Sequence, residues 1–217
     1  MNVSINKDTK IYCSFSKTAG NKGCEFFNKS FAKYNIDALY KSFSINNIND
    51  AYKAALCLKF SGCAIAMPFK KQAYELVTYK DESAELSKSV NTIIFDHNTD
   101  TSIGYNTDYY ATDIILKPYI KTYKIINILG NGGLSTAVQA KCRDLGFEVN
   151  LITRENWNTI KDLKDSLIFN CTSVNNIEVK PNNVFIDCII GTSTGDEFHK
   201  YQSHKQFTLY TNLIYEV

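Results

Sequence analysis

The sequence predicts an α/β fold in two parts. Strand-like and helix-like segments alternate along the chain, the first half contains a complete β-α-β-α-β pattern, and a glycine turn between a strand and a helix lies near the middle, at 130–133. Alternation of this kind is typical of parallel strands joined by helical crossovers. The 217 residues, 44% of them hydrophobic, can fill one large or two small domains. We favour two, because a full α/β series precedes the glycine turn.

The first part is expected to contain three strands and two helices. The strands are 9–16, 37–45 and 62–69, and the helices are 23–35 and 47–60.

A hairpin and a helix then connect the two parts. The segments 89–95 and 101–106 are expected to pair around a turn-rich stretch, and 107–121 is expected to be a helix that bends or ends near Pro118. The second part repeats the α/β order, with strands at 123–130, 147–153, 166–172 and 182–190 and a helix at 133–145.

Charge and composition argue against several classes of partner. The formal net charge is +2, from 24 Lys and Arg against 22 Asp and Glu. This excess of positive charge is too small to indicate a nucleic-acid-binding surface. The longest apolar run, 55–69, is interrupted by Lys59, and the first ten residues lack the apolar core of a signal peptide. We therefore expect no membrane segment and a soluble, cytoplasmic protein.

The cysteines and histidines do not form a metal-binding pattern. The seven cysteines are scattered without a C-x-x-C pair, and most stand in apolar segments, where buried reduced thiols are expected. None of the three histidines, His97, His199 and His204, has another at the i, i+4 spacing that two ligands on one helical face require. The sequence therefore predicts no metal.

The glycine turn predicts a dinucleotide site. Gly130, Asn131, Gly132 and Gly133 stand between a strand and a helix, where bare backbone can approach a pyrophosphate and the helix N-terminus favours negative charge. An ordinary tight turn is the alternative interpretation, and the strand and helix on either side favour the cofactor.

The end of the next strand bears on which cofactor binds. Thr153 and Arg154 stand there, in place of the acidic residue that takes the ribose 2′-hydroxyl of NAD. A guanidinium suits a 2′-phosphate, so NADP is favoured. Glu155 could repel that phosphate, pair with Arg154 or hold a ribose hydroxyl itself, which keeps NAD as an alternative.

Four polar residues in the first half are candidates for catalysis and substrate binding. Lys70 follows a buried strand, Asp108 opens the connecting helix, and together they could share the proton of a reacting hydroxyl. Taken alone, each residue is better explained as a solvated surface charge or, for Asp108, as a helix N-terminal residue favoured by the dipole. Ser14 and Ser16 could likewise be ordinary polar residues at a strand end.

Six ordered motifs resemble the shikimate dehydrogenase family, and most closely its shikimate dehydrogenase-like branch. They are INKDTKIYCSFS, GCAIAMPFKK, SVNTI, YNTD, GNGGLSTAV and NCTS, and they span nearly the whole chain. The resemblance implies an N-terminal α/β substrate-binding domain, a Rossmann-type NADP-binding domain and a catalytic cleft between them.

The resemblance also implies roles for individual residues. Ser14 and Ser16 match the serines that bind the substrate carboxylate, and Asn91 matches the asparagine that binds substrate hydroxyls. Lys70 and Asp108 match the catalytic pair.

Three features depart from the family pattern. The serine segment continues as SKTAGNKGCEFFN instead of S-x-S-P-x-x-H-N, and Ala64 and Ala66 replace an asparagine and a threonine. The C-terminal region is shortened, which leaves a reduced Rossmann domain. Gln202, five residues before Phe207, matches a substrate-contacting glutamine of the family. Loss of two polar groups at positions 64 and 66 is expected to weaken shikimate binding or change the preferred substrate.

The expected division is a substrate domain at 1–106 and a dinucleotide domain at 107–196, with a helix near 197–212 packing back on the first domain. The expected activity is that of an NADP-dependent oxidoreductase of shikimate and aromatic amino acid biosynthesis, acting on a cyclic hydroxy acid such as shikimate or quinate. A nucleotide- or metabolite-binding regulatory protein is the alternative, and a structural α/β protein is a remote third. The protein is expected to be a monomer or a homodimer.

Overall fold

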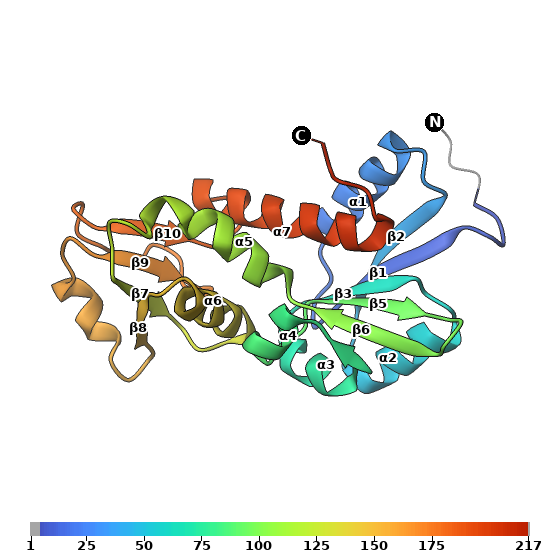
Figure 1. Ribbon diagram of the computed structural model, residues 1–217, viewed down its shortest axis with the longest axis horizontal. Helices are drawn as coiled ribbons and strands as arrows, with labels where there is room; N and C mark the ends of the chain where they lie inside the picture. The colour runs from blue at the N-terminus through green and yellow to red at the C-terminus, as the bar shows by residue number, and fades with distance from the viewer. Residues whose placement is uncertain (1–4, 217) are drawn as a thin grey trace. The chain divides into compact units, whose positions relative to one another are not determined.

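The computed structural model describes residues 5–216 and divides them into two compact units (Figure 1). The first unit comprises 5–85, 89–105 and 206–216, and the second comprises 86–88 and 106–205. Apart from the short segment 86–88, the chain enters the second unit after Tyr105 and returns to the first at Gln206, inside the last helix.

The first unit contains six strands and the helices between them. Its elements are β1 (Lys10–Ser16), α1 (Lys22–Lys33), β2 (Ala38–Ser44), α2 (Ile48–Cys57), β3 (Gly62–Ile65), α3 (Lys70–Leu76), β4 (Tyr79–Lys80), β5 (Thr92–Asp96) and β6 (Thr101–Tyr105), with α4 (Glu82–Ser87) divided between the units.

A mixed sheet of strand order β2-β1-β3-β5-β6-β4 forms the centre of this unit. β1 is parallel to both β2 and β3, as the β-α-β-α-β pattern predicts, and β5 and β6 form the expected antiparallel hairpin. Because β5 is also antiparallel to β3, the end of β3 lies beside the start of β5. The short α3, β4 and α4 were not predicted, since none is long enough to show a period.

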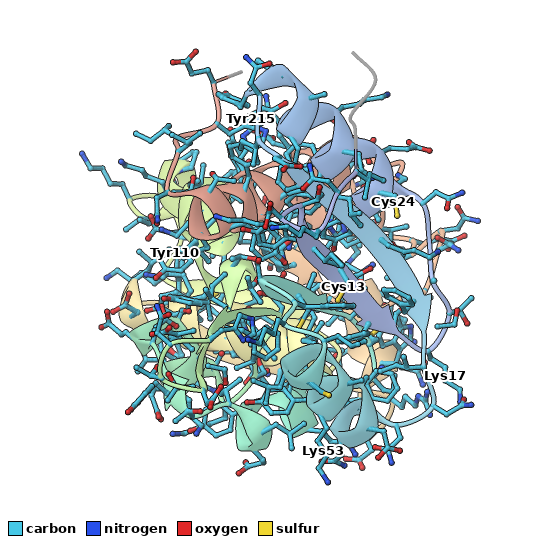
Figure 2. The ribbon with its side chains drawn as sticks, turned by 90° about the vertical axis from the view of Figure 1, so that its right-hand side faces the viewer. Cys13, Lys17, Cys24, Lys53, Tyr110 and Tyr215 are labelled. Carbon is cyan, nitrogen blue, oxygen red and sulfur yellow. The ribbon has the colours of Figure 1, made fainter. Side chains whose placement is uncertain are left out.

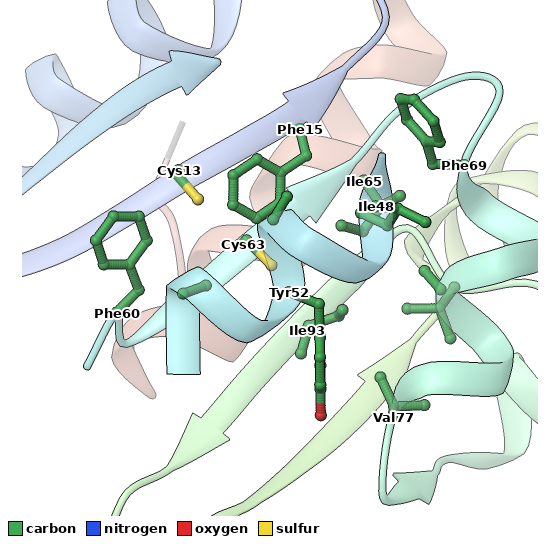
Figure 3. Packing of buried hydrophobic residues seen from close by; sticks show 14 of the residues in the cluster. Cys13, Phe15, Ile48, Tyr52, Phe60, Cys63, Ile65, Phe69, Val77 and Ile93 are labelled. Carbon is green, nitrogen blue, oxygen red and sulfur yellow. The ribbon is translucent and has the colours of Figure 1, made fainter. Parts of the chain in front are cut away.

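Both faces of this sheet are packed, because successive strand residues point to opposite sides. On one face Cys13 and Phe15 of β1 pack with Ile48 and Tyr52 of α2 and with Ile93 of β5 (Figure 3).

The opposite face is aromatic. It joins side chains of β1, β2, α1 and the end of the last helix: Tyr12, Phe27, Phe31, Tyr40, Phe207 and Tyr210. Each fully buried ring contributes roughly 1.5–3 kcal/mol by leaving water.

The second unit contains four strands and begins with the connecting helix. Its elements are α5 (Thr107–Leu116), η1 (Lys117–Tyr119), β7 (Ile125–Leu129), α6 (Gly133–Asp144), β8 (Glu148–Ile152), η2 (Trp157–Asp162), β9 (Leu167–Asn170), β10 (Val184–Asp187) and most of α7 (Ser193–Thr211). The connecting helix ends at Leu116, and η1 contains Pro118, as expected from the missing N–H of proline.

The sheet of the second unit is parallel, with strand order β10-β9-β7-β8. The chain turns to one side of β7 to form β8 and to the other side to form β9. Ligands of open α/β sheets bind outside the carboxyl ends of the strands at such a point, which here is the end of β7. Only the short η2 lies between β8 and β9, so this Rossmann-like unit is a reduced one.

The fold class predicted from the sequence, α/β with a reduced Rossmann-type second part, is confirmed. All seven cysteines are free thiols, and Cys13, Cys63, Cys142 and Cys188 are buried. Figure 2 shows Cys13 inside the sheet, while Lys17 and Lys53 extend from the surface.

Candidate functional site

Ser14 and Ser16 lie at the end of β1, on the aromatic face of the first unit. Ser14 is the Cα partner of Ala64 in β3, and Ala64 is the partner of Thr92 in β5. Directly paired residues point to the same side of a sheet, so these three side chains form one row. Ser16, two residues farther along, points to the same side and is 9% exposed. Beyond the buried Tyr12, the face therefore changes from aromatic to hydroxyl-bearing.

Asn91 directly precedes β5, and its side chain belongs to a buried hydrogen-bond network. The Thr92 hydroxyl donates to Asn91 Oδ1 at 2.9 Å and accepts from Gln206 Nε2 at 2.8 Å. Gln206 Nε2 also donates to the backbone oxygen of Asn91 at 3.3 Å. Asn91, Thr92 and Gln206 are 2%, 0% and 3% exposed, so solvent does not compete for these bonds.

Lys70 is the first residue of α3 and is half-buried. Its backbone oxygen accepts from Val90 N at 2.9 Å, which fixes the start of α3 beside the residue that precedes Asn91. The segment before α3 is bonded to the end of β1, since Ala66 N donates to Phe15 O at 2.9 Å. The first unit thus brings the segments of Ser14, Ser16, Lys70 and Asn91 together where β1 and β3 end and β5 begins.

Asp108 occupies the first turn of α5 in the second unit and is 3% exposed. Asn106 caps this helix: its Oδ1 accepts from Asp108 N at 3.1 Å, and its Nδ2 donates to Ser87 Oγ at 3.0 Å. A carboxylate in this position is favoured by the helix dipole. Gln202 Nε2 donates to the hydroxyl of Thr107 at 3.2 Å, which places this glutamine beside the segment that carries Asp108.

The glycine turn joins β7 to α6 at the switch point of the parallel sheet. Gly130 has φ +93°, and a Cβ added to it would lie 2.6 Å from Thr172 Cγ2, so this position requires glycine. A Cβ on Gly132, by contrast, meets no atom within 4 Å. Ser135 Oγ donates to Gly130 O at 2.6 Å and holds the turn against the helix. Gly132 therefore leaves room for a ligand group at the N-terminus of a twelve-residue helix.

The loop after β8 is shaped by Asn156, whose Oδ1 accepts from Thr153 N at 2.7 Å. The loop is tied to the glycine turn, because Gly130 N donates to Ile152 O at 2.8 Å. Arg154 and Glu155 are both exposed and form no ion pair with each other. Of the three roles considered for Glu155, pairing with Arg154 is therefore absent from the structure, and the guanidinium is accessible to an anionic ligand.

Neither a metal cluster nor a membrane span is evident in the part of the chain that the structure describes. No group of three or more His, Cys, Asp or Glu side chains among residues 5–216 could hold a metal ion. Within the same residues, no helix is long and apolar enough to cross a bilayer.

Comparison with known proteins agrees with the motifs. Residues 21–93 match the shikimate dehydrogenase substrate binding domain. A shikimate dehydrogenase-like protein of Haemophilus influenzae is 32% identical over 196 residues, which cover 89% of this chain and 70% of that protein. This chain belongs to the shikimate dehydrogenase family.

Two further matches to this family extend over most of this chain. A shikimate dehydrogenase (NADP(+)) of Aquifex aeolicus is 29% identical over 73% of this chain, and the match spans 58% of that protein. The solved structure of a shikimate 5-dehydrogenase-like protein superimposes with a TM-score of 0.83 at 26% identity, covering 98% of this chain and 95% of that one.

The residues expected to act in a shikimate dehydrogenase fall into two groups. The first unit holds Ser14, Ser16, Lys70 and Asn91. The second unit holds Asp108, Gln202, the glycine turn with Asn131, and the Thr153–Arg154 pair. Their roles in binding and catalysis stay predictions.

Sequence reasoning missed Thr92, Gln206 and Thr172. Thr172 closes the turn against Gly130, and its hydroxyl donates to Asn170 Oδ1 at 2.7 Å. Thr92 and Thr172 stand inside the motifs VNT and NCTS, where attention to every polar residue would have found them. Gln206 had a weaker signal: it lies four residues after Gln202, on the same side of a helix.

Proposed function

We propose that this chain is an NADP-dependent oxidoreductase that interconverts a cyclic polyhydroxy carboxylate and its keto form, as shikimate and 3-dehydroshikimate are related. The observation that carries the proposal is the turn after β7, where the space beside Gly132 is open at the N-terminus of α6. A dinucleotide pyrophosphate fits this environment because it is anionic and needs close approach to the backbone. Family membership supplies the reaction type.

The cofactor residues are assigned by charge and position. In this proposal the turn from Gly130 to Gly133 binds the pyrophosphate, and Thr153 and Arg154 bind the adenosine 2′-phosphate. The exposed Arg154 guanidinium can make charge-assisted, bidentate bonds to a phosphate, which a ribose hydroxyl cannot match.

The substrate residues are assigned from their hydrogen-bonding groups. Ser14 and Ser16 offer hydroxyl donors to the substrate carboxylate, Asn91 offers its side-chain amide to ring hydroxyls, and Gln202 contributes a further contact. Hydroxyl and amide groups of this kind suit a small molecule that carries several oxygen atoms.

Lys70 and Asp108 are assigned to the reacting hydroxyl. NADP, when bound, would supply a nicotinamide that can take up a hydride from the substrate carbon, and the proton of the hydroxyl would pass to the Asp108 carboxylate. Asp108 accepts a hydrogen bond from this hydroxyl and orients it, while the Lys70 ammonium stabilises the negative charge that develops on its oxygen. In the reverse direction the proton returns to the same oxygen.

The test is single-turnover hydride transfer with saturating NADP and a panel of cyclic hydroxy acids. Lys70→Met and Asp108→Asn are expected to slow transfer about 10²- to 10⁴-fold each, without changing NADP affinity. The double variant is expected to lose much less than the product of the two, because residues that act as a unit are not additive. Lys71→Met is the matched control, since Lys71 follows Lys70 on the same helix and is exposed.

Cofactor choice is tested by fluorescence titration. Arg154→Ala is expected to weaken NADP binding about 10- to 100-fold and NAD binding little, whereas Arg143→Ala should change neither. Equal losses for the two cofactors would contradict the role of Arg154.

A binding or regulatory protein is the second candidate. It is favoured by the small, four-stranded sheet of the second unit. NADP binding without hydride transfer from any acid of the panel would support it, whereas a Lys70→Met protein with unchanged turnover would contradict only the role of Lys70.

A further inference from the structure

The side chain of Gln206 lies in the first unit, at the start of the buried network that leads to Asn91. Its amide nitrogen is 3.3 Å from the backbone oxygen of Asn91 and 2.8 Å from the hydroxyl oxygen of Thr92. The Thr92 hydroxyl is in turn 2.9 Å from Asn91 Oδ1. We refer to these three side chains, Gln206, Thr92 and Asn91, as the relay.

We propose that Gln206 is a positioning residue. It fixes which group donates and which accepts in each hydrogen bond of the relay, and so determines which end of the Asn91 amide faces the substrate. This inference rests on the proposed function, because it concerns the substrate contact assigned there to Asn91.

The direction follows from donor and acceptor chemistry. A backbone oxygen can only accept, so the end of the Gln206 amide that faces Asn91 O must be the NH₂ group. The same NH₂ group faces Thr92, and the Thr92 hydroxyl must therefore accept from it. The hydroxyl has one proton, which it can then donate to its other neighbour in the relay, Asn91 Oδ1. The oxygen of the Asn91 amide is thereby held toward Thr92, and its NH₂ group is held at the other end.

The relay has a consequence for substrate choice. An NH₂ group donates, so the substrate atom opposite Asn91 must accept, as the oxygen of a hydroxyl or a ketone does. Both the alcohol and the keto form of the substrate meet this requirement. An ammonium group in the same place cannot accept, and a cyclic acid that carries an amine there is expected to be rejected.

Two observations explain why this chain would need such a glutamine. Ala64, which stands in the row between Ser14 and Thr92, has no polar group with which to orient Thr92. All three members of the relay are at most 3% exposed, so water cannot replace a missing partner. Without Gln206 the Thr92 hydroxyl can rotate, so it no longer has to donate its proton to Asn91 Oδ1.

The experiment uses variants that change hydrogen bonding with little change in volume. Gln206→Met and Thr92→Val break the relay, whereas Thr92→Ser retains the hydroxyl. Tyr210→Phe is the control on the same helix: Tyr210 is buried one turn after Gln206, and within residues 5–216 its hydroxyl has no hydrogen-bond partner.

The first measurement needs no substrate. In ¹H–¹⁵N spectra of the full chain, the Asn91 side-chain NH₂ signals are expected to shift in Gln206→Met and Thr92→Val and to stay in place in Thr92→Ser and Tyr210→Phe. Unchanged Asn91 signals in Gln206→Met would overturn the inference whether or not the protein is an enzyme.

The second measurement is steady-state kinetics with shikimate and NADP. Breaking the relay is expected to raise KM for shikimate about 10-fold, with kcat and NADP affinity nearly unchanged, and the double variant should match either single one. An equal loss in Tyr210→Phe, or a loss in kcat alone, would contradict a positioning role. Failure of the unaltered protein to turn over any acid would reject the proposed function, and the spectra would still decide the direction of the relay.

Discussion

Gly130→Ala is a direct test of how the glycine turn is built, because two separate costs can be read from the structure. Gly130 has φ +93°, a conformation that costs a residue with a Cβ about 1–2 kcal/mol. The new methyl group would also lie 2.6 Å from Thr172 Cγ2, and overpacking of this kind costs about 1–3 kcal/mol. We therefore expect Gly130→Ala to lower the free energy of unfolding of the second unit by about 2–5 kcal/mol.

Two further variants separate the costs. Gly146→Ala has only the conformational cost of a positive φ, since Gly146 has φ +84° and an added Cβ meets nothing within 4 Å. Thr172→Ser removes the methyl group that Gly130→Ala would strike but keeps the hydroxyl bonded to Asn170 Oδ1. Combined with Gly130→Ala, it is expected to restore about 1–3 kcal/mol and to leave the conformational cost unrecovered.

The assay is urea unfolding followed by tryptophan fluorescence. Trp157 is the one tryptophan of the chain and lies in the second unit, so its signal reports the unit that contains the turn. If Gly130→Ala and Gly146→Ala lower stability equally, or if Thr172→Ser restores nothing, the contact with Thr172 is not what requires glycine at position 130.

Two other predictions concern charge and substrate range. Hydrogen bonds from Lys141 and Tyr109 lower the pKa of Asp144, so this group stabilises the fold above its unfolded pKa of about 3.9 and ceases to do so as pH falls through its lower folded pKa. Asp144→Asn should therefore cost up to about 1 kcal/mol in urea unfolding at pH 7, a modest value because the carboxylate is half exposed. The difference should disappear as pH falls through the lowered folded pKa of Asp144, and a difference that does not change with pH would argue against the ion pair. Ala64→Asn combined with Ala66→Thr is expected to lower KM for shikimate about 5- to 10-fold per recovered hydrogen bond, measured by NADPH formation, and no change would show that these positions do not set substrate preference.

Much of the fold was predictable because it depends on local pattern. The alternation of strands and helices predicted the parallel pairing of β1 with β2 and β3, and the segment around Gly130 predicted the strand-turn-helix of the second unit. The boundaries of α3 and α4 were not predictable, because helices of six or seven residues take their conformation from packing more than from their own periodicity.

Only those residues of the candidate site that lie within short recognisable motifs could be predicted from the sequence. Lys70 and Asp108 could be named from short motifs, whereas the contact of Thr172 with Gly130 joins residues that are adjacent only after β9 has paired with β7. The bond from Gln206 to Asn91 spans 115 residues of sequence. Sequence patterns extend over short segments of the chain, so they cannot predict a hydrogen bond between residues this far apart.

The last helix shows why one glutamine could be predicted and the other could not. Gln202 and Gln206 are one turn apart on α7, and each donates to the hydroxyl of a threonine, Thr107 and Thr92 respectively. Each threonine directly adjoins a residue proposed to act on the substrate, Asp108 after Thr107 and Asn91 before Thr92. Gln202 falls in a family motif and was assigned as a substrate contact, yet the structure gives it the same local bond as Gln206. The shared bond indicates that a glutamine on this helix can serve by orienting a neighbouring site residue. For Gln206 we consider that role the main one, because its amide nitrogen donates both to the backbone oxygen of Asn91 and to the Thr92 hydroxyl.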